Sequence, residues 1–330
     1  MGLCWHNTST LFEEPAIKMR KSLLSIVIST YNRAHMLDQA LKSLAEQTAQ
    51  GQFEIVVVDN NSTDETAVVV QKWIDNSCMR LVRVLEPKQG LSYARNCGIA
   101  HAHGEFIAFI DDDVRVTPQW VESVIEILLR MPDIDCLTGP VDPLWESGVA
   151  PDWLNNELLC SIGVGNYGDN PKILKGKEYP IGANMIFRRS TFSRIGQFDP
   201  RLGRIGINLL SCEEVEFIDR LRRKGGKIFY HPAVRVKHFV QAARTTKQYV
   251  LSRRQWDGRS FAIWEQIRGG KRLLLQNALL RVLFVIPRDA VGWALSTLIS
   301  DQHQRFVYTC RLAKTVAYLD QVQRNLFCSG

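Results

Sequence analysis

The sequence predicts an α/β fold in which a mostly parallel sheet carries helices on both faces. Short apolar, β-branched stretches alternate with helical patterns through the first third of the 330-residue chain. This alternation is typical of parallel sheets covered by crossover helices. Hydroxyl, amide and carboxylate side chains follow the expected strands directly. In such sheets ligands bind beyond the carboxyl ends of the strands, so we expect a site at that edge.

The expected elements follow one another at short spacing. Strands are expected within 23–30, 53–58, 80–87 and 105–114, and helices within 34–48, 59–74 and 90–104. The first helix places Leu37, Leu41 and Leu44 on one face, as a helix packed on a sheet requires. Residues 130–210 are rich in Pro, Gly and Trp and are expected to form loops over the polar edge, and a turn and a strand follow within 225–240.

Cysteine usage and the N-terminus constrain the cellular setting. The eight cysteines are scattered and form no CxxC pair, which argues against a structural zinc site and a disulfide framework and favours a reducing compartment. The first residues show no secretory signal, and His6 stands where a myristoylation motif has Ser or Thr. Met19 is an alternative start to Met1.

Charge is distributed unevenly. Residues 219–330 hold 21 Lys and Arg against 6 Asp and Glu, a net charge of +15, whereas the remaining residues have a net charge of −8. This basic tail suggests a surface for polyanions, either nucleic acid or anionic lipid headgroups. Its longest uncharged run, 290–300, is far shorter than the roughly 20 residues of a spanning helix. We therefore expect apolar helices that lie on a membrane or dock on the main domain.

Three aspartates end the fourth expected strand. In an extended segment Asp111 and Asp113 would point the same way, and their oxygens suit Mg²⁺ or Mn²⁺ bridging to substrate phosphates. The alternative is an Asp-rich turn without a ligand. The sequence contains no Walker A motif and no GxGxxG after the first strand, so P-loop and dinucleotide-binding proteins are not indicated.

An ordered series of motifs resembles family 2 glycosyltransferases, which are inverting enzymes of the GT-A fold. The series is SIVISTYNR, IVVVDNNSTDET, GLSYARNCGI, FIDDDV, PIGANMIFRRSTFSRIGQFDPRL and CEEVEF. It covers roughly residues 23–240. The resemblance implies a nucleoside-diphosphate-sugar donor, with a leaning to UDP, and a Mn²⁺ or Mg²⁺ cofactor.

The resemblance also implies roles for single residues. Those implied to bind the nucleotide sugar are Thr30, Tyr31, Asn32, Asp59, Arg95, Asp111, Asp112, Gly182, Ala183 and Asn184. Thr30 and Tyr31 would line the nucleobase pocket, Asp111 would lie by the ribose and Asp113 would hold the metal. The sequence has NNS where the family often has DGS, which leaves Asp59 in place.

His238 is expected on the inward face of a strand. In AVRVKHFV it alternates with Val234, Val236 and Val240. One interpretation is a hydrogen-bonded core histidine. The other comes from the family, in which a histidine at this position often completes the metal site together with the aspartate corresponding to Asp113.

The stretch CEEVEF contains three glutamates at an expected helix start. Glu214 precedes Phe217 and Ile218 by three and four residues and therefore shares their apolar face. Glu213 has a more solvent-like setting and serves the helix start, where the macrodipole favours acid, and Glu216 is expected on the surface. The family usually has an aspartate as general base here, which aligns with Glu214; Glu213 is the alternative.

The basic tail contains RRQWDGRSFAIWEQ. Its arginines and tryptophans are Arg253, Arg254, Trp256, Arg259 and Trp264. They could stack a sugar or hold a lipid diphosphate. The alternative is a basic amphipathic helix packed through its tryptophans.

The resulting interpretation has three parts. We predict an N-terminal extension (1–22), a glycosyltransferase domain (23–240, with nucleotide-binding half 23–115 and acceptor half 116–240) and a basic, partly apolar helical tail (241–330). The enzyme would be a hexosyltransferase that transfers a sugar to a saccharide or lipid-linked acceptor in cell-surface polysaccharide or glycolipid synthesis. It would be cytoplasmic and contact the anionic inner face of the cell membrane through the tail, without nucleic acid. The alternatives are a sugar nucleotidyltransferase and a non-catalytic nucleotide- or RNA-binding module.

Overall fold

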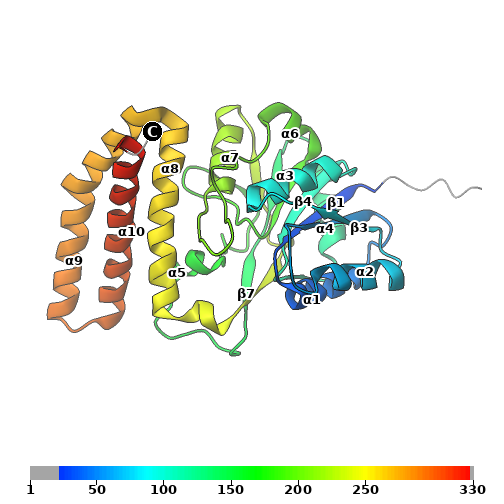
Figure 1. The fold of residues 1–330 in the computed structure, drawn as a ribbon, viewed down its shortest axis with the longest axis horizontal. Coiled ribbons are helices and arrows are strands. Elements are labelled where there is room, and N and C mark those ends of the chain that lie inside the picture. Colours follow the sequence, from blue (N-terminus) through cyan, green and yellow to red (C-terminus); the bar gives the residue numbers. More distant parts are fainter. Residues whose placement is uncertain (1–21, 328–330) are drawn as a thin grey trace, which may run out of the picture.

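The computed structural model describes residues 22–327 and is built around an eight-stranded sheet. The strand order is β3-β2-β1-β4-β9-β6-β10-β8. Figure 1 shows this sheet between helices, with a separate group of long helices on its left. The predicted N-terminal extension and the alternative start at Met19 lie outside the described residues, apart from residue 22.

The first four strands in space are parallel. They are β3 (Leu81–Leu85), β2 (Phe53–Asp59), β1 (Leu24–Thr30) and β4 (Phe106–Asp111). β9 (Met185–Arg188) then enters antiparallel between β4 and β6 (Cys136–Thr138), and β10 (Ile228–Tyr230) and β8 (Lys172–Ile173) complete the sheet. A smaller sheet contains β5 (Val114–Val116), β11 (Val236–Val240) and β7 (Val141–Trp145).

Helices cover both faces of the large sheet. α1 (Ala34–Ala45), α2 (Thr66–Asn76) and α4 (Trp120–Arg130) pack on one face, and α3 (Leu91–His101), α6 (Arg189–Ile195) and α7 (Glu213–Arg223) on the other.

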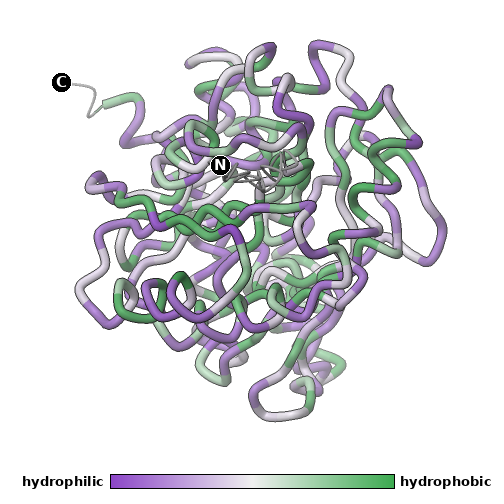
Figure 2. Tube along the Cα trace, turned by 90° about the vertical axis from the view of Figure 1, so that its right-hand side faces the viewer, coloured by the Kyte–Doolittle hydropathy of each residue, from purple (hydrophilic) through white to green (hydrophobic). Residues whose placement is uncertain are grey.

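β1 shows why the strands are apolar throughout. Ile26 and Ile28 belong to one core cluster and Val27 to the other, because successive side chains of a strand point to opposite faces. Both faces are covered, so both sets are buried. The interior strands are accordingly hydrophobic in Figure 2. The predicted α/β architecture, with a mostly parallel sheet between helices, is confirmed.

The C-terminal region is helical, as predicted. η2 (Ala242–Thr245) leads into α8 (Lys247–Leu280), which is followed by the π-helix η3 (Arg281–Val285), α9 (Ile286–Leu298) and α10 (Gln302–Phe327). α8 is kinked at Gly269 and Gly270, whose backbone angles are not helical. We call residues 271–299 the outer helix, because Figure 1 shows α9 at the edge of the molecule with α10 between it and α8.

This region docks on the main domain through α8 and α10. Val250 of α8 and Val307 of α10 pack in one buried cluster with Leu158 of α5 (Asn156–Leu159) and Ile162 of η1 (Cys160–Ile162). The apolar stretch for which docking or membrane contact was expected lies in the outer helix, which contributes no residue to this cluster and keeps an exposed apolar face. None of the helices within residues 22–327 has the length and apolar character needed to cross a bilayer.

Gly258 sets the distance between α8 and α10. A Cβ atom at this position would lie 2.0 Å from the carbonyl oxygen of Lys314 in α10. We expect Gly258→Ala to lower the free energy of unfolding by about 1–3 kcal/mol, as overpacking does. Denaturant unfolding would measure this. Gln255→Ala, at an exposed position of the same helix, is the control, and equal stability of the two variants would contradict this packing.

Candidate active site

A cavity of about 930 Å³ lies beyond the carboxyl ends of the central strands. Thr30 at the end of β1 and Asp111 at the end of β4 line it, together with the first residues of α7 and parts of α8 and α10. The predicted position of the site, at the polar edge of the sheet, is therefore where the structure has its cavity.

The three aspartates do not form one extended segment, contrary to expectation. Asp111 ends β4, whereas Asp112 and Asp113 form a turn before β5. Asp111 is partly exposed and Asp112 and Asp113 are buried, so Asp111 and Asp113 are in different environments. A turn interrupts the period-2 alternation on which the prediction depended.

Asp113 is surrounded by basic groups. Its Oδ2 atom lies 2.8 Å from Arg33 Nη2 and 3.2 Å from Arg244 Nη1, and its Oδ1 atom lies 3.2 Å from His238 Nε2. Burial alone would raise the pKa of Asp113, but His238, Arg33 and Arg244 hold that pKa well below its usual value. Asp113 is therefore a carboxylate with one oxygen facing an imidazole.

Asp112 is held by two donors. Thr30 Oγ1 donates to its Oδ2 atom at 2.8 Å and Arg33 Nη1 to its Oδ1 atom at 2.6 Å. Burial raises the pKa of Asp112 to about 6, against the opposing effect of Arg33. Asp112 thus ties the loop after β1 to the loop after β4.

His238 occupies the inward face of β11, as the alternation predicts, and is 3% exposed. Gly163 packs against its ring: a Cβ atom there would lie 3.0 Å from His238 Cε1, and the backbone φ of +76° favours glycine. Neither His238 Nδ1 nor Asp113 Oδ1 has a hydrogen-bond partner among the described residues.

Asp113 Oδ1 and His238 Nε2, which lie 3.2 Å apart at the cavity, together fit a divalent cation. Imidazole nitrogen and carboxylate oxygen are common ligands for Mn²⁺. Within residues 22–327 no group of three or more His, Cys, Asp or Glu side chains could hold a metal. A cation at Asp113 and His238 would therefore take further ligands from substrate phosphates or water.

Arg95 and Glu213 form a buried ion pair across the cavity wall. Arg95 Nη1 donates to Glu213 Oε1 at 2.8 Å, and Arg95 Nη2 lies 3.7 Å from Asp111 Oδ1. Both partners are less than 5% exposed. The expected solvent-like setting of Glu213 is therefore wrong, because the sequence pattern did not reveal the arginine of α3.

Glu214 lines the cavity and is more exposed than Glu213. Burial, and next the charge of Glu213, raise the pKa of Glu214 to about 8. Its Oε2 atom has no hydrogen-bond partner among the described residues. Such a carboxyl group can accept a proton at near-neutral pH.

The expectation that Glu216 lies on the surface is also wrong. Glu216 is 3% exposed, and its carboxylate accepts hydrogen bonds from Arg220 at 2.6 and 2.8 Å. Arg220 in turn donates to the carbonyl oxygens of Ile195 and Gln197. Glu216 therefore anchors α7 to the segment after α6.

Most residues implied to bind the donor line the cavity. Those that do are Thr30, Tyr31, Arg95, Asp111, Asp112, Gly182 and Ala183. Gly182 is close to Arg95, because a Cβ atom at Gly182 would lie 2.9 Å from Arg95 Nη2. The GAN loop thus reaches the cavity through its two small residues.

Asn32, Asp59 and Asn184 are not part of the cavity lining. Asp59 Oδ2 accepts from Arg83 and Oδ1 from the Ser62 backbone. The side chains of Asn32 and Asn184 bind backbone groups of neighbouring loops. These three residues shape the loops around the cavity.

Sequence reasoning missed several lining residues: Arg33, Asn60, Arg204 and Arg244. Arg33 stands in the STYNR motif, directly after residues that were singled out, so its place after a strand could have indicated it. Arg204 and Arg244 come from loops whose paths no local pattern predicts.

The tail motif is divided between two roles. Arg253 and Arg254 line the cavity. Trp264 is 7% exposed in a core cluster, and Arg259 stacks on Trp256 with its Cζ atom 5.1 Å from the ring centroid. Packing through the tryptophans is therefore present, and binding of a sugar or lipid diphosphate by this motif stays a prediction.

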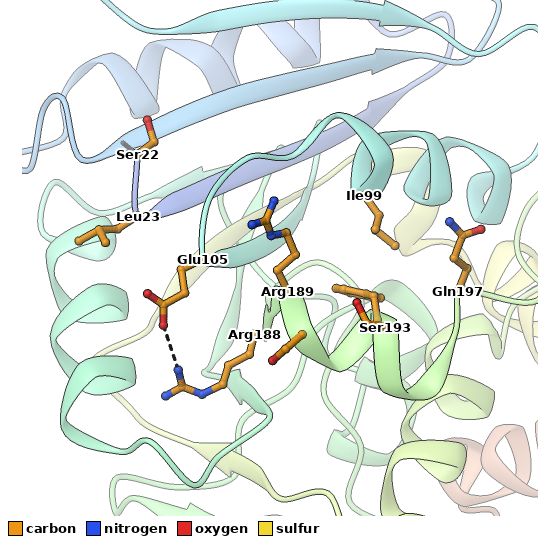
Figure 3. A pocket seen from close by; sticks show the side chains of 10 residues that line it. Ser22, Leu23, Ile99, Glu105, Arg188, Arg189, Ser193 and Gln197 are labelled. Atoms are coloured by element: carbon orange, nitrogen blue, oxygen red, sulfur yellow. Dashed lines mark hydrogen bonds and ion pairs between the residues drawn. The ribbon is translucent and has the colours of Figure 1, made fainter. Parts of the chain in front are cut away.

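A second cavity, of about 730 Å³, lies at the opposite end of β1 (Figure 3). Arg188 faces Glu105 there at 3.4 Å and donates to the carbonyl oxygens of Ile134 and Leu128. Arg189 donates to the carbonyl of Ala102. The arginines that line this cavity therefore already have partners within the protein.

Comparison with known proteins identifies the family and supports the fold. The family model described as "Glycosyl transferase family 2" matches residues 25–196. A glucosyl-dolichyl phosphate glucuronosyltransferase of Haloferax volcanii is 25% identical over 80% of this chain and 85% of its own length. The chain spans only about a quarter of the validoxylamine A glucosyltransferases of Streptomyces hygroscopicus and of the chondroitin synthase of Pasteurella multocida that it also matches.

Solved structures show the same fold. The mannosyltransferase PcManGT of Pyrobaculum calidifontis, in complex with GDP-Man and Mn²⁺, superposes with a TM-score of 0.61 at 19% identity over 94% of this chain and 88% of its own. TarS of S. aureus in complex with UDP-GlcNAc has a TM-score of 0.54 at 16% identity, covering 92% and 91%. With the matched family model spanning more than half of the chain, this protein belongs to glycosyl transferase family 2 and is a nucleotide-sugar glycosyltransferase of the GT-A fold.

Proposed function

We propose that this glycosyltransferase moves a sugar, with inversion, from a nucleoside-diphosphate sugar to an acceptor hydroxyl, with Glu214 as general base. The observation that carries the proposal is the arrangement of one cavity. It has the buried Asp113–His238 pair on one side and a carboxyl group with a raised pKa, Glu214, on another. Because the chain belongs to a family of glycosyltransferases, we do not propose the two alternative functions, a sugar nucleotidyltransferase and a non-catalytic binding module.

The donor would lie along the ends of β1 and β4. Thr30 and Tyr31 line that part of the cavity and would contact the nucleobase, and Asp111 would accept a hydrogen bond from the ribose. Gly182 and Ala183 would let the backbone approach the sugar diphosphate closely. Asn32, Asp59 and Asn184 would act by shaping these loops, and Arg95 by holding Glu213 and Asp111 in place.

Asp113 and His238 would hold the divalent cation, with Asp112 beside them. When bound, Mn²⁺ or Mg²⁺ would offset the negative charge of the leaving diphosphate. Arg33 and Arg244, which contact Asp113, place two further positive charges at the same point. Arginine forks of this kind bind phosphate oxygens well.

Glu214 is preferred to Glu213 as the base because its carboxyl group is not committed to an ion pair. Glu213 accepts from Arg95 through Oε1 at 2.8 Å and is held in that buried ion pair. Glu214 would take the proton from the acceptor hydroxyl as that oxygen attacks the anomeric carbon. A base whose pKa is near the working pH is suited to this task.

The acceptor would be a saccharide or a lipid-linked sugar of polysaccharide or glycoconjugate synthesis. The Haloferax relative is named for a glucosyl-dolichyl phosphate, and a 25% identical relative of Rhizobium meliloti is named a succinoglycan biosynthesis protein. One solved relative holds GDP-Man and another holds UDP-GlcNAc. The prediction that the donor of this enzyme carries UDP is therefore to be tested by a screen of nucleotide sugars.

The outer helix supports a peripheral contact with an anionic membrane. Its exposed side includes Leu279, Leu283 and Phe284, which are 58, 54 and 64% exposed, whereas its inward side buries Asp289 and Ser296. The outer helix therefore keeps large apolar side chains exposed although it buries Leu274 and Ala278 against α10, and such an exposed apolar group marks an interaction surface.

Charge makes lipid headgroups the suitable partner of this surface. Residues 271–300 contain one acidic residue, Asp289, which is buried. The basic residues Lys271, Arg272 and Arg288 of the same segment are exposed. An apolar face with basic flanks binds anionic interfaces. On this basis the location that we propose for the enzyme is the inner face of the cell membrane.

The donor site can be tested by thermal stabilisation. We expect one of UDP-glucose, UDP-GlcNAc or GDP-mannose to raise Tm in the presence of MnCl₂, because a ligand at 100 times its Kd stabilises by about 2.7 kcal/mol. Asp113→Asn should remove the manganese-dependent part of the shift, whereas Asp152→Asn, at an exposed position, should not. The same shift in both variants would contradict a cation at Asp113.

The two glutamates can be separated by pH profiles of donor turnover. Glu214→Gln should lower turnover by about 10²–10⁴-fold, the usual contribution of a general base, and Glu214→Asp should restore part of it. Because the base must be unprotonated, wild-type activity should fall as pH decreases through about 8. Glu213→Gln removes a like charge, so this limb should move to lower pH.

These variants also test the alternative base. If Glu213 were the base, Glu213→Gln would abolish turnover instead of moving the limb of the profile. Full turnover of Glu214→Gln would exclude Glu214 from the role. Unfolding curves of both variants would show that each remains folded, which matters since Glu213→Gln leaves Arg95 without its closest carboxylate.

Membrane contact can be tested by co-sedimentation with vesicles of phosphatidylcholine with or without phosphatidylglycerol. The wild type should bind the anionic vesicles, less so at high salt. The double variant Leu279→Glu, Leu283→Glu should bind at least about tenfold more weakly. Val68→Glu, at a 68% exposed position of α2, is the matched control. A change of oligomeric state with unchanged vesicle binding would instead indicate a second copy of the chain.

A further inference from the structure

The cavity has a basic wall made by the second half of the chain. Arg204 lies in the loop before α7, Arg244 in η2, Arg253 and Arg254 in α8, and Lys314 in α10. The proposed donor residues, by contrast, come mainly from β1, β4 and the loops that follow them. The cavity therefore has basic groups beyond those assigned to the donor.

Most arginines of the cavity already have carboxylate partners. Arg244 contacts Asp113 at 3.2 Å. Arg253 Nη2 lies 3.4 Å from Asp257 Oδ1, and Arg254 Nη1 lies 3.6 Å from Asp257 Oδ2. One aspartate is thus shared between two neighbouring guanidinium groups.

Arg204 differs from these arginines. Among the described residues its guanidinium has no hydrogen bond and no ion pair, and only its backbone carbonyl is used, by the N–H of Leu91. Burial, and then the charges of Arg253 and Arg244, lower the pKa of Arg204. A partly buried cation beside two others, facing a cavity, is a site for an anion.

The position of Arg253 connects this anion site to the proposed base. Arg253 donates to the carbonyl oxygen of Leu209, in the loop that carries Arg204. Arg253 and Glu214 both line the cavity. Burial alone would lower the pKa of Arg253, but the charges of Asp257, Tyr249 and Glu214 raise it. The anion would therefore lie on the side from which the acceptor hydroxyl approaches Glu214.

We propose that Arg204, supported by Arg253, binds a phosphate group carried by the acceptor. This inference rests on the proposed function and specifies its acceptor as a phosphate-bearing molecule. Guanidinium groups match phosphate oxygens with two parallel hydrogen bonds. The donor has its own positive charges at Arg33, Arg244 and the cation that Asp113 would hold, which leaves Arg204 and Arg253 of the basic wall for a second phosphate. Lys314, whose Nζ atom lies over the ring of Phe261, extends this wall toward α10.

The test is calorimetric titration with farnesyl phosphate and with farnesol, each with and without UDP and MnCl₂. Because UDP occupies the donor site, farnesyl phosphate cannot bind there when UDP is present. The wild type should bind farnesyl phosphate but not farnesol, also when UDP is present. Arg204→Gln should weaken farnesyl phosphate about tenfold or more and change UDP affinity less than about twofold. Arg204→Lys should give an intermediate affinity.

The control is Arg130→Gln, which removes an exposed arginine of α4 outside the cavity lining; it should leave both affinities unchanged. Equal loss of UDP and farnesyl phosphate affinity in Arg204→Gln would assign Arg204 to the donor diphosphate and overturn the proposal. Equal binding of farnesyl phosphate and farnesol, or unchanged binding in Arg204→Gln, would do the same. If the wild type did not bind UDP, the proposed donor site would be contradicted. The titrations with farnesyl phosphate in the absence of UDP would then still measure the effect of Arg204→Gln.

Discussion

The buried ion pair between Arg95 and Glu213 determines how the rest of the active site is arranged. It joins α3 to the first turn of α7, and Arg95 also reaches the carbonyl of Gly182 and the carboxylate of Asp111. Removing one partner of such a pair costs about 3–5 kcal/mol, because the other charge stays buried. With Glu213 held in this way, the next residue, Glu214, lines the cavity. Burial, and next the charge of Glu213, raise the pKa of Glu214.

β1, β2 and β4 could be predicted from the sequence to within a few residues, because a strand buried on both faces must be apolar throughout. The expectation of loops over residues 130–210 was wrong, because β6, β7, β8 and β9 lie there. β1, β2 and β4 end where the polar groups begin. The ordered motifs then indicated the family. The charged side chains were harder to place: the helical pattern assigned Glu213 and Glu216 to water, whereas Arg95 and Arg220 hold them in the interior. A periodic pattern contains no information on partners that are distant in sequence.

The backbone explains another difference between expectation and structure. Cys212, just before α7, has a φ of 72°, a left-handed conformation that is uncommon for a residue with a side chain. It directs the chain into α7 so that Glu213 meets Arg95. The turn at Asp112 and Asp113 similarly separates the environments of two aspartates that a regular strand would have paired. Local geometry of this kind depends on tertiary contacts, which were not visible in the sequence.

The contribution of α10 to the cavity has a consequence for synthesis of the protein. The strands that carry Thr30 and Asp111 leave the ribosome early, whereas Lys314 follows about two hundred residues later. Chains fold from the N-terminus as they are made, so the nucleotide half can form before the basic wall is complete. A nascent chain would therefore gain its two substrate sites at different times, and the site next to α10 would be the later one.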